Sequence, residues 1–321
     1  MPLPEPTGQA GGEDWPERLR REWPGAIEWD SPMARRCTLR VGGPARAVAL
    51  PATLAELVQL ASLLGVLGIP WRVIGRGSNL LVADAGFEGV LVVLDRRFGA
   101  IERRPARGDG MVPVRVEAGC GLMRLVNWCS SEGLTGLEFA AGIPGSLGGA
   151  VVMNAGAWGG EMSERIGSVC FVGTDGSVEW VTRDRLEFGY RYLATAGRMV
   201  AAAEFLLKPG APSAIEAACR DLLRRRKERQ PQRVASAGSF FKNPAGLPAA
   251  GRLIEECGLK GSKVGGAQVS PVHANFLVNT GGATAQDFLD LMRLVQERVS
   301  ERFGVWLEPE VRIIGTAKER A

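Results

Sequence analysis

Three junctions between apolar runs and loops are rich in glycine, and their backbone N–H groups could bind phosphate oxygens. The junctions are residues 75–79 (GRGSN), 119–121 (GCG) and 142–149 (GIPGSLGG). A single loop of this kind is more often an ordinary tight turn. Three in succession, in a chain with 43 glycines among 321 residues, indicate a ligand that carries phosphate groups.

The glycine loops do not match the fingerprints of the two commonest nucleotide-binding folds. Leu80 and Arg124 stand where G-x-G-x-x-G requires its third glycine, and no G-x-x-x-x-G-K-[ST] occurs. We therefore expect neither a Rossmann nor a P-loop fold. Residues 142–149 combine glycine with apolar side chains, so a large, mostly apolar cofactor with a central diphosphate would explain both features. FAD is such a cofactor.

The remaining reactive side chains exclude several classes of function. A basic run that ends in Lys227 and Arg229 is either a phosphate site or the solvated face of a helix. The six cysteines form no C-x-x-C pair and His273 is the only histidine, so we expect no metal site and no disulfide framework. The net charge of +4 is small for bulk nucleic-acid binding, and we expect no nucleic-acid partner.

The elements that must position these groups follow from hydrophobic periodicity. The pattern predicts a strand at 45–50, a helix at 53–67 and a strand at 71–74, and strands dominate the region up to residue 210. Helices are expected at 213–229, 247–257 and 284–303, with a last strand at 310–314. No apolar run approaches the ~18 residues that would span a membrane, so we expect no membrane insertion.

Five blocks of sequence, in order, resemble the UDP-N-acetylenolpyruvoylglucosamine reductase (MurB) family, in the subgroup that lacks an inserted tyrosine loop. The blocks are residues 38–43 (TLRVGG), 74–82, 142–156, 238–244 (GSFFKNP) and 307–315 (LEPEVRIIG). The resemblance covers residues 20–315. It implies an α+β fold, with a two-part FAD-binding region of the vanillyl-alcohol-oxidase/PCMH type and a C-terminal α+β substrate-binding domain. We expect a disordered leader at 1–20, FAD-binding subdomains at 21–95 and 96–210, and the substrate-binding domain at 211–321.

The activity that the resemblance implies is reduction of UDP-N-acetylglucosamine enolpyruvate to UDP-N-acetylmuramate, a step of peptidoglycan precursor synthesis. Non-covalent FAD is the implied cofactor, NADPH the implied reductant, and a UDP-sugar the implied substrate. We expect a monomer in the cytoplasm, whose reducing conditions suit a chain without a disulfide framework.

Hydride addition to an enol ether needs stabilisation of negative charge and a proton donor. The resemblance places these roles on Arg191, Ser239 and Glu310. Arginine offers a planar, permanently charged fork to a carboxylate. Ser239 would donate the proton with help from a neighbour such as Lys242 or a water, and Glu308 competes with Glu310 for the carboxyl role. Without the resemblance, Arg191 would be interpreted as a member of a surface ion pair, Ser239 as a serine in a turn, and Glu310 as an exposed charge at the end of a strand.

Further site residues are carried over from the same resemblance. The positions implied for FAD are Arg40, Gly42, Gly75, Arg76, Gly77, Ser78, Asn79, Leu80, Gly119, Ile143, Pro144, Gly145, Ser146, Gly149, Ala150, Asn154, Ala155, Gly156 and Arg312. Those implied for the nucleotide-sugar are Asn243 and Gln268, with Lys227, Arg229 and Lys260 as candidates for its diphosphate. His273 is interpreted as a hydrogen-bonded structural histidine.

The chain departs from the family pattern at Leu193, where a serine is usual two positions after the arginine. If that serine orients the arginine in the family, other groups must orient Arg191 in this chain. Two other functions stay open. An alcohol or sugar oxidase would use the same FAD fold, often with covalent flavin, and a non-catalytic nucleotide-binding paralogue would have lost turnover.

Overall fold

The structure is a computed structural model that describes residues 15–315. The described residues divide into two compact units: unit 1 comprises residues 15–29, Ala47–Gly75 and Gly89–Leu223, and unit 2 comprises Asp30–Arg46, Arg76–Glu88 and residues 224–315. Of the leader expected over residues 1–20, residues 1–14 lie outside the described residues. Helix α1 (Trp15–Glu22) begins within that range and buries Leu19, so residues 15–20 are ordered rather than part of a leader.

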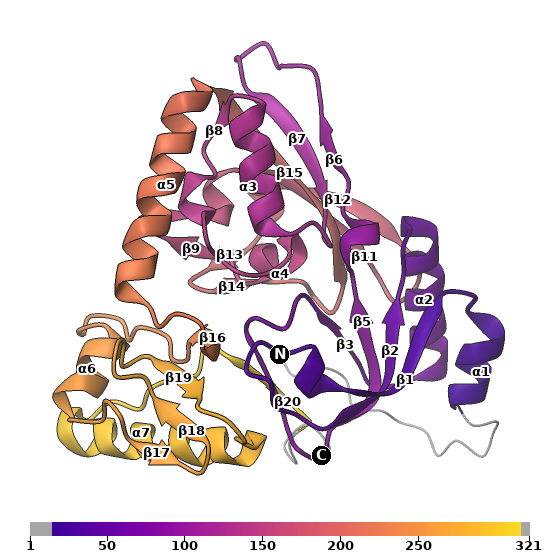
Figure 1. Cartoon of the computed structure of the whole chain (residues 1–321). Coiled ribbons are helices and arrows are strands. Elements are labelled where there is room, and N and C mark those ends of the chain that lie inside the picture. Colours follow the sequence, from indigo (N-terminus) through magenta and orange to yellow (C-terminus); the bar gives the residue numbers. More distant parts are fainter. Residues whose placement is uncertain (1–14, 316–321) are drawn as a thin grey trace. The chain divides into compact units, whose positions relative to one another are not determined.

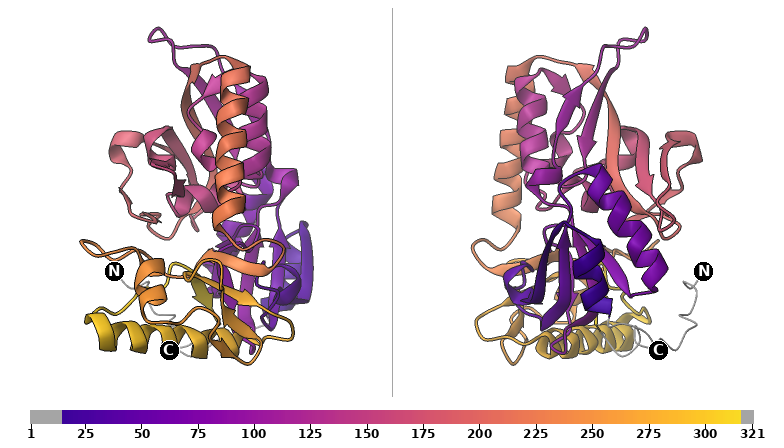
Figure 2. Two further views of the ribbon diagram at one scale, coloured as in Figure 1. Left: turned by 60° about the vertical axis from the view of Figure 1, so that its left-hand side comes forward. Right: turned by 90° about the vertical axis from the view of Figure 1, so that its right-hand side faces the viewer.

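The largest sheet of unit 1 is antiparallel and runs in the order β12-β11-β15-β7-β6, with β8 pairing with β15. Residues alternate between buried and half-buried along β15 because successive side chains point to opposite faces. Helix α4 packs against β15, and helices α3 and α5 lie side by side (Figures 1 and 2). The bounds are β6 (Ile101–Arg103), β7 (Val112–Glu117), β8 (Leu134–Thr135), β11 (Ile166–Val172), β12 (Val178–Thr182), β15 (Met199–Pro209), α3 (Leu122–Ser131), α4 (Leu147–Val152) and α5 (Pro212–Arg229).

A second sheet contains the β-α-β pattern predicted at residues 45–74. Its order is β1-β2-β5-β3, and β3 runs parallel to β5. Helix α2 begins after Thr53, whose side chain accepts the N–H of Glu56, and ends at Gly68 in the left-handed conformation (φ 61°). The bounds are β1 (Ala26–Pro32), β2 (Pro44–Leu50), α2 (Leu54–Leu67), β3 (Trp71–Ile74) and β5 (Phe87–Val93). The predicted strand, helix and strand are confirmed.

Unit 2 is built on the antiparallel sheet β16-β19-β18-β17, against which helix α7 packs (yellow in Figure 2). A capping box between Thr284 and Asp287 starts α7, and Gly304 ends it. Its buried residues recur at helical spacing, as expected for one face on a core. The bounds are β16 (Ala235–Ser239), α6 (Ala250–Glu256), β17 (Lys263–Val264), β18 (Ala267–Val269), β19 (Phe276–Asn279) and α7 (Ala285–Phe303).

Two expected elements of unit 2 are shorter than predicted. Helix α6 begins at Ala250, not at residue 247, because Asn243 Oδ1 accepts the N–H of Ala250 (3.0 Å) and Pro248 precedes the helix. Strand β20 (Arg312–Ile314) pairs in parallel with β4 (Leu80–Val82), and it starts two residues after Glu310. Glu310 therefore lies in the connection before the strand and not at its start.

Candidate active site

Two of the predicted glycine segments meet in unit 1, and Gly75 lies beside them. Gly121 and Ser146 form an antiparallel bridge, and the N–H of Leu147 donates to the carbonyl of Cys120 (2.8 Å). A Cβ atom on Gly75 would lie 2.5 Å from Ser146 Oγ. The structure thus brings parts of three segments predicted to bind FAD to one place in unit 1.

The geometry at Gly149 fits a bulky cofactor. A Cβ atom there would meet only Ser146 Oγ, at 3.7 Å, which is an ordinary van der Waals contact. Packing within the protein therefore does not require glycine at this position, and its small size leaves room for a ligand. At Gly148, by contrast, a Cβ would lie 2.8 Å from Ala118 Cβ, so that glycine serves close packing.

The FAD positions predicted in unit 2 are joined by backbone hydrogen bonds. The carbonyl of Gly77 accepts the N–H of Thr38 at 3.0 Å and its hydroxyl at 3.3 Å. Arg312 donates its N–H to the carbonyl of Asn79 (3.1 Å) and pairs with Leu80 in the sheet. Residues far apart in sequence, from the TLRVGG block, the GRGSN loop and the last strand, are therefore held together within this unit.

Arg191 lies in unit 1, in the turn between β13 (Phe188–Gly189) and β14 (Tyr192–Leu193), with φ at 57°. Its Nη2 donates to the carbonyl of Gly156 (3.1 Å), and its guanidinium carbon lies 5.1 Å from the centre of the Tyr190 ring. A left-handed backbone is costly for a residue with a side chain. The surrounding contacts must hold this turn in place.

Asn154 is the main tie between this turn and the third glycine segment. It is 1% exposed and adopts φ 39°. Its Nδ2 donates to the carbonyl of Gly189 (3.1 Å), and its Oδ1 accepts the N–H of Ser163 (3.0 Å). A residue predicted to bind FAD thus supports the turn that carries the residue predicted to bind the substrate carboxylate.

Leu193, which replaces the serine of the family pattern, is 2% exposed and belongs to the main hydrophobic core of unit 1. It pairs with Phe188 across the β13–β14 ladder. Its side chain donates no hydrogen bond, so main-chain groups and Asn154 orient the turn of Arg191 in this protein.

Ser239 and Glu310 lie in unit 2, on neighbouring segments. Phe240, which follows Ser239, accepts the N–H of Glu310 at its carbonyl (2.8 Å). Phe241 and Pro309 form an isolated bridge. The carbonyl of Glu310 also accepts a hydrogen bond from Asn79 Nδ2 (3.0 Å). Both predicted catalytic residues of this unit are half-buried, and a predicted FAD residue contacts one of them.

Glu308 and Lys242 pair with each other beside this segment. Lys242 Nζ donates to Glu308 Oε1, and the Lys242 N–H donates to the Glu308 carbonyl (2.9 Å). The Glu308 side chain is 70% exposed. This pairing favours Glu310 over Glu308 as the carboxyl group in a closed site, and it directs Lys242 toward Glu308.

The residues predicted to bind the nucleotide-sugar are dispersed over unit 2. Asn243 caps helix α6, Gln268 Nε2 donates to the carbonyl of Gly261 (3.1 Å), and Lys260 pairs with Glu255 (2.6 Å). Lys227 and Arg229 are exposed near the end of α5. Asn243, Gln268 and Lys260 thus have structural partners in addition to the role predicted for them.

His273 is hydrogen-bonded, as its interpretation as a structural residue requires. Nδ1 accepts the N–H of Asn275 (3.2 Å), and the ring packs edge-on against Phe276 at 4.9 Å. Burial lowers the pKa of His273, because the charged imidazolium loses hydration. Asn275, which is absent from the residues predicted from sequence, makes four hydrogen bonds here. An amide residue directly before the apolar run 276–278 is the signal that could have identified it.

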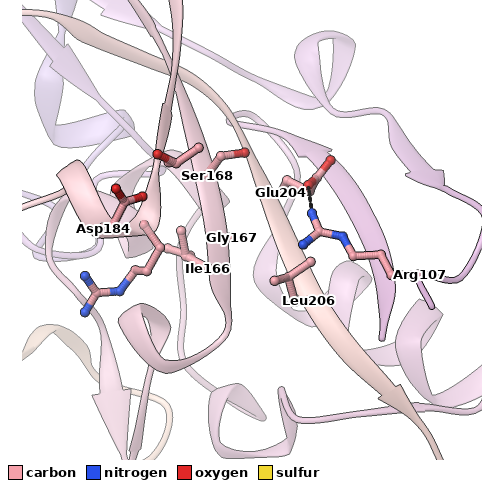
Figure 3. A pocket seen from close by; sticks show the side chains of 9 residues that line it. Arg107, Ile166, Gly167, Ser168, Asp184, Glu204 and Leu206 are labelled. Carbon is pink, nitrogen blue, oxygen red and sulfur yellow. Dashed lines mark hydrogen bonds and ion pairs between the residues drawn. The ribbon is translucent and has the colours of Figure 1, made fainter. Parts of the chain in front are cut away.

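An open groove of about 530 Å³ lies elsewhere in unit 1 (Figure 3). Arg107 pairs with Glu204 on one side of it, and Ser168 and Asp184 lie on the other. None of the residues predicted for FAD, substrate or catalysis lines this groove. In the described part of the chain, no cluster of three possible metal ligands occurs, and no helix is long and apolar enough to cross a membrane.

Comparison with known families identifies the class of protein first. The model of an FAD binding domain matches residues 45–182, and the model of the UDP-N-acetylenolpyruvoylglucosamine reductase C-terminal domain matches residues 230–314. The chain is an FAD-dependent oxidoreductase, and the α+β class and FAD-binding region predicted from the sequence are confirmed.

Relatives along nearly the whole chain then identify the family. A UDP-N-acetylenolpyruvoylglucosamine reductase of Pelobacter propionicus is 47% identical over 292 residues, which are 91% of this chain and 96% of the relative. One from Geobacter metallireducens is 46% identical over 304 residues, 93% of this chain and 97% of the relative. The crystal structure of MurB from Thermus caldophilus superimposes with a TM-score of 0.75 at 38% identity, covering 90% of this chain and 98% of that one. The chain belongs to the UDP-N-acetylenolpyruvoylglucosamine reductase family.

Proposed function

We propose that the protein reduces UDP-N-acetylglucosamine enolpyruvate to UDP-N-acetylmuramate, with NADPH as the reductant of its FAD. The observation that carries the proposal is the 47% identity, over 91% of the chain, to a reductase with this name. The three residues that the family pattern assigns to catalysis, Arg191, Ser239 and Glu310, are all present. The product is a precursor of peptidoglycan, which defines the proposed biological role.

FAD held by the residues predicted for it, among them Gly75, Ser146 and Gly149, would supply hydride chemistry, so that hydride from NADPH reaches the methylene carbon of the enol ether. The protein must then stabilise the negative charge that develops on the enolpyruvyl carboxylate. Arg191 is assigned this role because its guanidinium is always charged and offers a planar fork of donors. Its bond to the Gly156 carbonyl fixes the orientation of the guanidinium, which favours a preorganised contact with a carboxylate.

The carbon next to the reduced methylene must receive a proton. We assign Ser239 as the donor and Glu310 as the carboxyl group that acts with it. A hydroxyl is a weak acid, so its efficiency as a donor depends on a fixed position relative to the reacting atom. The N–H of Glu310 donates to the carbonyl of Phe240, the residue that follows Ser239. This hydrogen bond holds the backbone of Glu310 at a fixed position relative to the backbone beside Ser239.

The compartment and assembly belong to the same proposal. All six cysteines lie among the described residues, are free, and five of them are buried. Free thiols of this kind are compatible with the reducing cytoplasm in which nucleotide-sugars and NADPH are found. The remaining parts of the proposal are non-covalent FAD, a UDP-sugar substrate bound by the C-terminal domain, and a monomeric protein.

The test separates the two half-reactions under anaerobic conditions. The FAD-loaded protein is reduced with NADPH, UDP-N-acetylglucosamine enolpyruvate is added, and flavin absorbance is followed in a stopped-flow instrument. Rapid reoxidation with formation of UDP-N-acetylmuramate supports the proposal. Flavin that stays reduced until oxygen is admitted would refute it and favour an oxidase.

Ser239→Ala tests the assignment of the proton donor in the same experiment. Reduction by NADPH is expected to be almost unchanged, while reoxidation by the enol ether slows. Ser236→Ala, on the same strand three residues earlier, is the control and is expected to leave both steps unchanged. Equal loss of both steps in Ser239→Ala would contradict the assignment.

A further inference from the structure

Asn275 is a buried amide beside the segment that carries Ser239. It is 3% exposed. Its main-chain carbonyl accepts the N–H of Phe240 (2.7 Å), its Oδ1 accepts the N–H of Phe241 (2.9 Å), and its Nδ2 donates to the carbonyl of Phe241 (2.8 Å). One residue thus satisfies three main-chain groups of the two residues that follow Ser239.

This arrangement occurs where regular pairing of β16 stops. The register between β16 and β19 shifts between Ser236 and Ser239, and Gly238 lies within the shift at φ 78°. The last pair of the ladder is Ser239 with Phe276. Asn275 directly precedes Phe276, and its carboxamide offers the donor and acceptor that a peptide group of a neighbouring strand would offer. The Asn275 side chain therefore supplies hydrogen bonds at the point where main-chain pairing between β16 and β19 ends.

The same hydrogen-bond chain reaches Glu310. The peptide group between Phe240 and Phe241 is held on both sides. Its N–H, which belongs to Phe241, donates to Asn275 Oδ1 (2.9 Å), and its carbonyl, which belongs to Phe240, accepts the N–H of Glu310 (2.8 Å). Phe240 and Phe241 are fully buried, and their rings lie 5.4 Å apart. Displacement of this peptide would therefore move the backbone next to Ser239 and the backbone of Glu310 together.

Asn275 is itself held by its neighbours. Its N–H donates to His273 Nδ1 (3.2 Å), and Ser270 Oγ accepts the N–H groups of Val272 and His273 (3.2 and 3.4 Å). Ser270 is 0% exposed. The turn from Ser270 to Asn275 is thus an ordered support and not a loose loop.

We propose that Asn275 is a positioning residue for the proton-delivery step: its carboxamide fixes the Phe240–Phe241 backbone and so keeps Ser239 and Glu310 in register. The inference rests on the proposed function for its catalytic consequence, whereas the positioning itself rests only on unit 2. Asn275 contacts neither substrate nor flavin in this assignment. It acts through the main chain of the residues that follow Ser239.

Asn275→Ala tests the proposal in the FAD-loaded protein, with Val295→Ala as the control. Val295 is a fully buried residue of α7 in the same core, so its truncation destabilises unit 2 without removing a hydrogen bond of the Phe240–Phe241 segment. We expect reoxidation of reduced flavin by saturating enol ether to slow by about 10- to 100-fold in Asn275→Ala, the loss typical of a displaced catalytic group. Reduction by NADPH and the affinity for FAD should stay within about twofold of the parent protein.

Asn275→Asp provides the test if the alanine variant does not fold. It keeps the size and the acceptor of the side chain but removes the donor to the Phe241 carbonyl, and reoxidation should again slow while flavin reduction does not. Equal slowing of both half-reactions, or a profile that matches Val295→Ala, would show that Asn275 serves stability alone and would overturn the inference.

Hydrogen–deuterium exchange distinguishes failure of this inference from failure of the proposed function. Peptides that cover residues 238–243 and 306–312 should both exchange faster in the Asn275 variants than in Val295→Ala. Unchanged exchange would overturn the positioning role whatever the kinetics. If the parent protein does not reduce the enol ether, the proposed function is refuted, and with it the catalytic consequence of Asn275. Faster exchange in the Asn275 variants would still confirm that Asn275 positions the segment.

Discussion

Gly149→Ala should separate FAD binding from folding. The added Cβ meets only Ser146 Oγ, at 3.7 Å, so the protein itself accommodates the methyl group. Gly149 is the third residue of α4, where alanine is favoured over glycine. Because glycine has more freedom in the unfolded chain, the free energy of unfolding of the FAD-free protein should rise by about 0.4–1 kcal/mol.

The affinity for FAD should change in the opposite direction. A methyl group inserted into a close-packed contact costs about 1–3 kcal/mol, which corresponds to a Kd raised by roughly 5- to 150-fold. Urea unfolding of the FAD-free protein measures the first quantity, and titration of flavin fluorescence measures the second. A more stable protein that binds its cofactor less well would be difficult to attribute to misfolding.

Two other glycines provide controls. A Cβ on Gly108 meets nothing within 4 Å, so Gly108→Ala should leave the affinity for FAD unchanged. Gly148→Ala places a Cβ 2.8 Å from Ala118 and should destabilise the FAD-free protein by overpacking. If Gly149→Ala binds FAD as tightly as the parent protein, the cofactor does not approach this residue, and the interpretation of its glycine is wrong.

Asp84→Ala should lower the free energy of unfolding by about 1–2 kcal/mol, because its carboxylate accepts the N–H groups of Ala285 and Gln286 (both 2.9 Å) in the first turn of α7. Urea unfolding measures the loss, and Glu301→Ala at the exposed end of the helix should show little change. Burial lowers the pKa of His273 in the folded protein below the ordinary value of 6.5. The unfolded chain therefore takes up the proton first as the pH falls, so the contribution of His273 to stability is complete above about pH 6.5 and is lost as the pH falls toward the folded pKa. Unfolding midpoints at pH 7.5 and 5.0 should therefore diverge more in the parent protein than in His273→Gln, and equal shifts would contradict this reasoning.

Local pattern was sufficient for most of the long elements. Helix α7 has capping residues at both ends and an apolar face at helical spacing, and the sequence predicts it to within one residue. The helix predicted at 213–229 likewise agrees to within one residue with α5 (Pro212–Arg229). In these segments each residue prefers the conformation that the fold imposes, so propensity and packing do not conflict.

The irregular parts could not be predicted, because they depend on partners distant in sequence. Asn79 and Glu310 are hydrogen-bonded across 231 positions, and no periodicity signals such a contact. Glu310 was expected at the start of a strand, but its N–H bonds to Phe240 and the strand begins only at Arg312. The left-handed turn at Arg191 depends in the same way on Asn154.

The two units position their predicted catalytic residues by different means. In unit 1, Arg191 depends on Gly156 and Asn154, which belong to the segment predicted to bind FAD. A cofactor that orders this segment would also order the arginine, so disturbance here should affect both half-reactions.

In unit 2, Ser239 depends on the Phe240–Phe241 segment and Asn275, which carry no predicted flavin contact. Disturbance there should affect mainly the step that needs a proton, although Glu310 also accepts a hydrogen bond from Asn79, a predicted FAD residue. Leu193 is consistent with the different support of the two units. Main-chain groups and Asn154 support Arg191, so a buried leucine can replace the serine of the family pattern without removing that support.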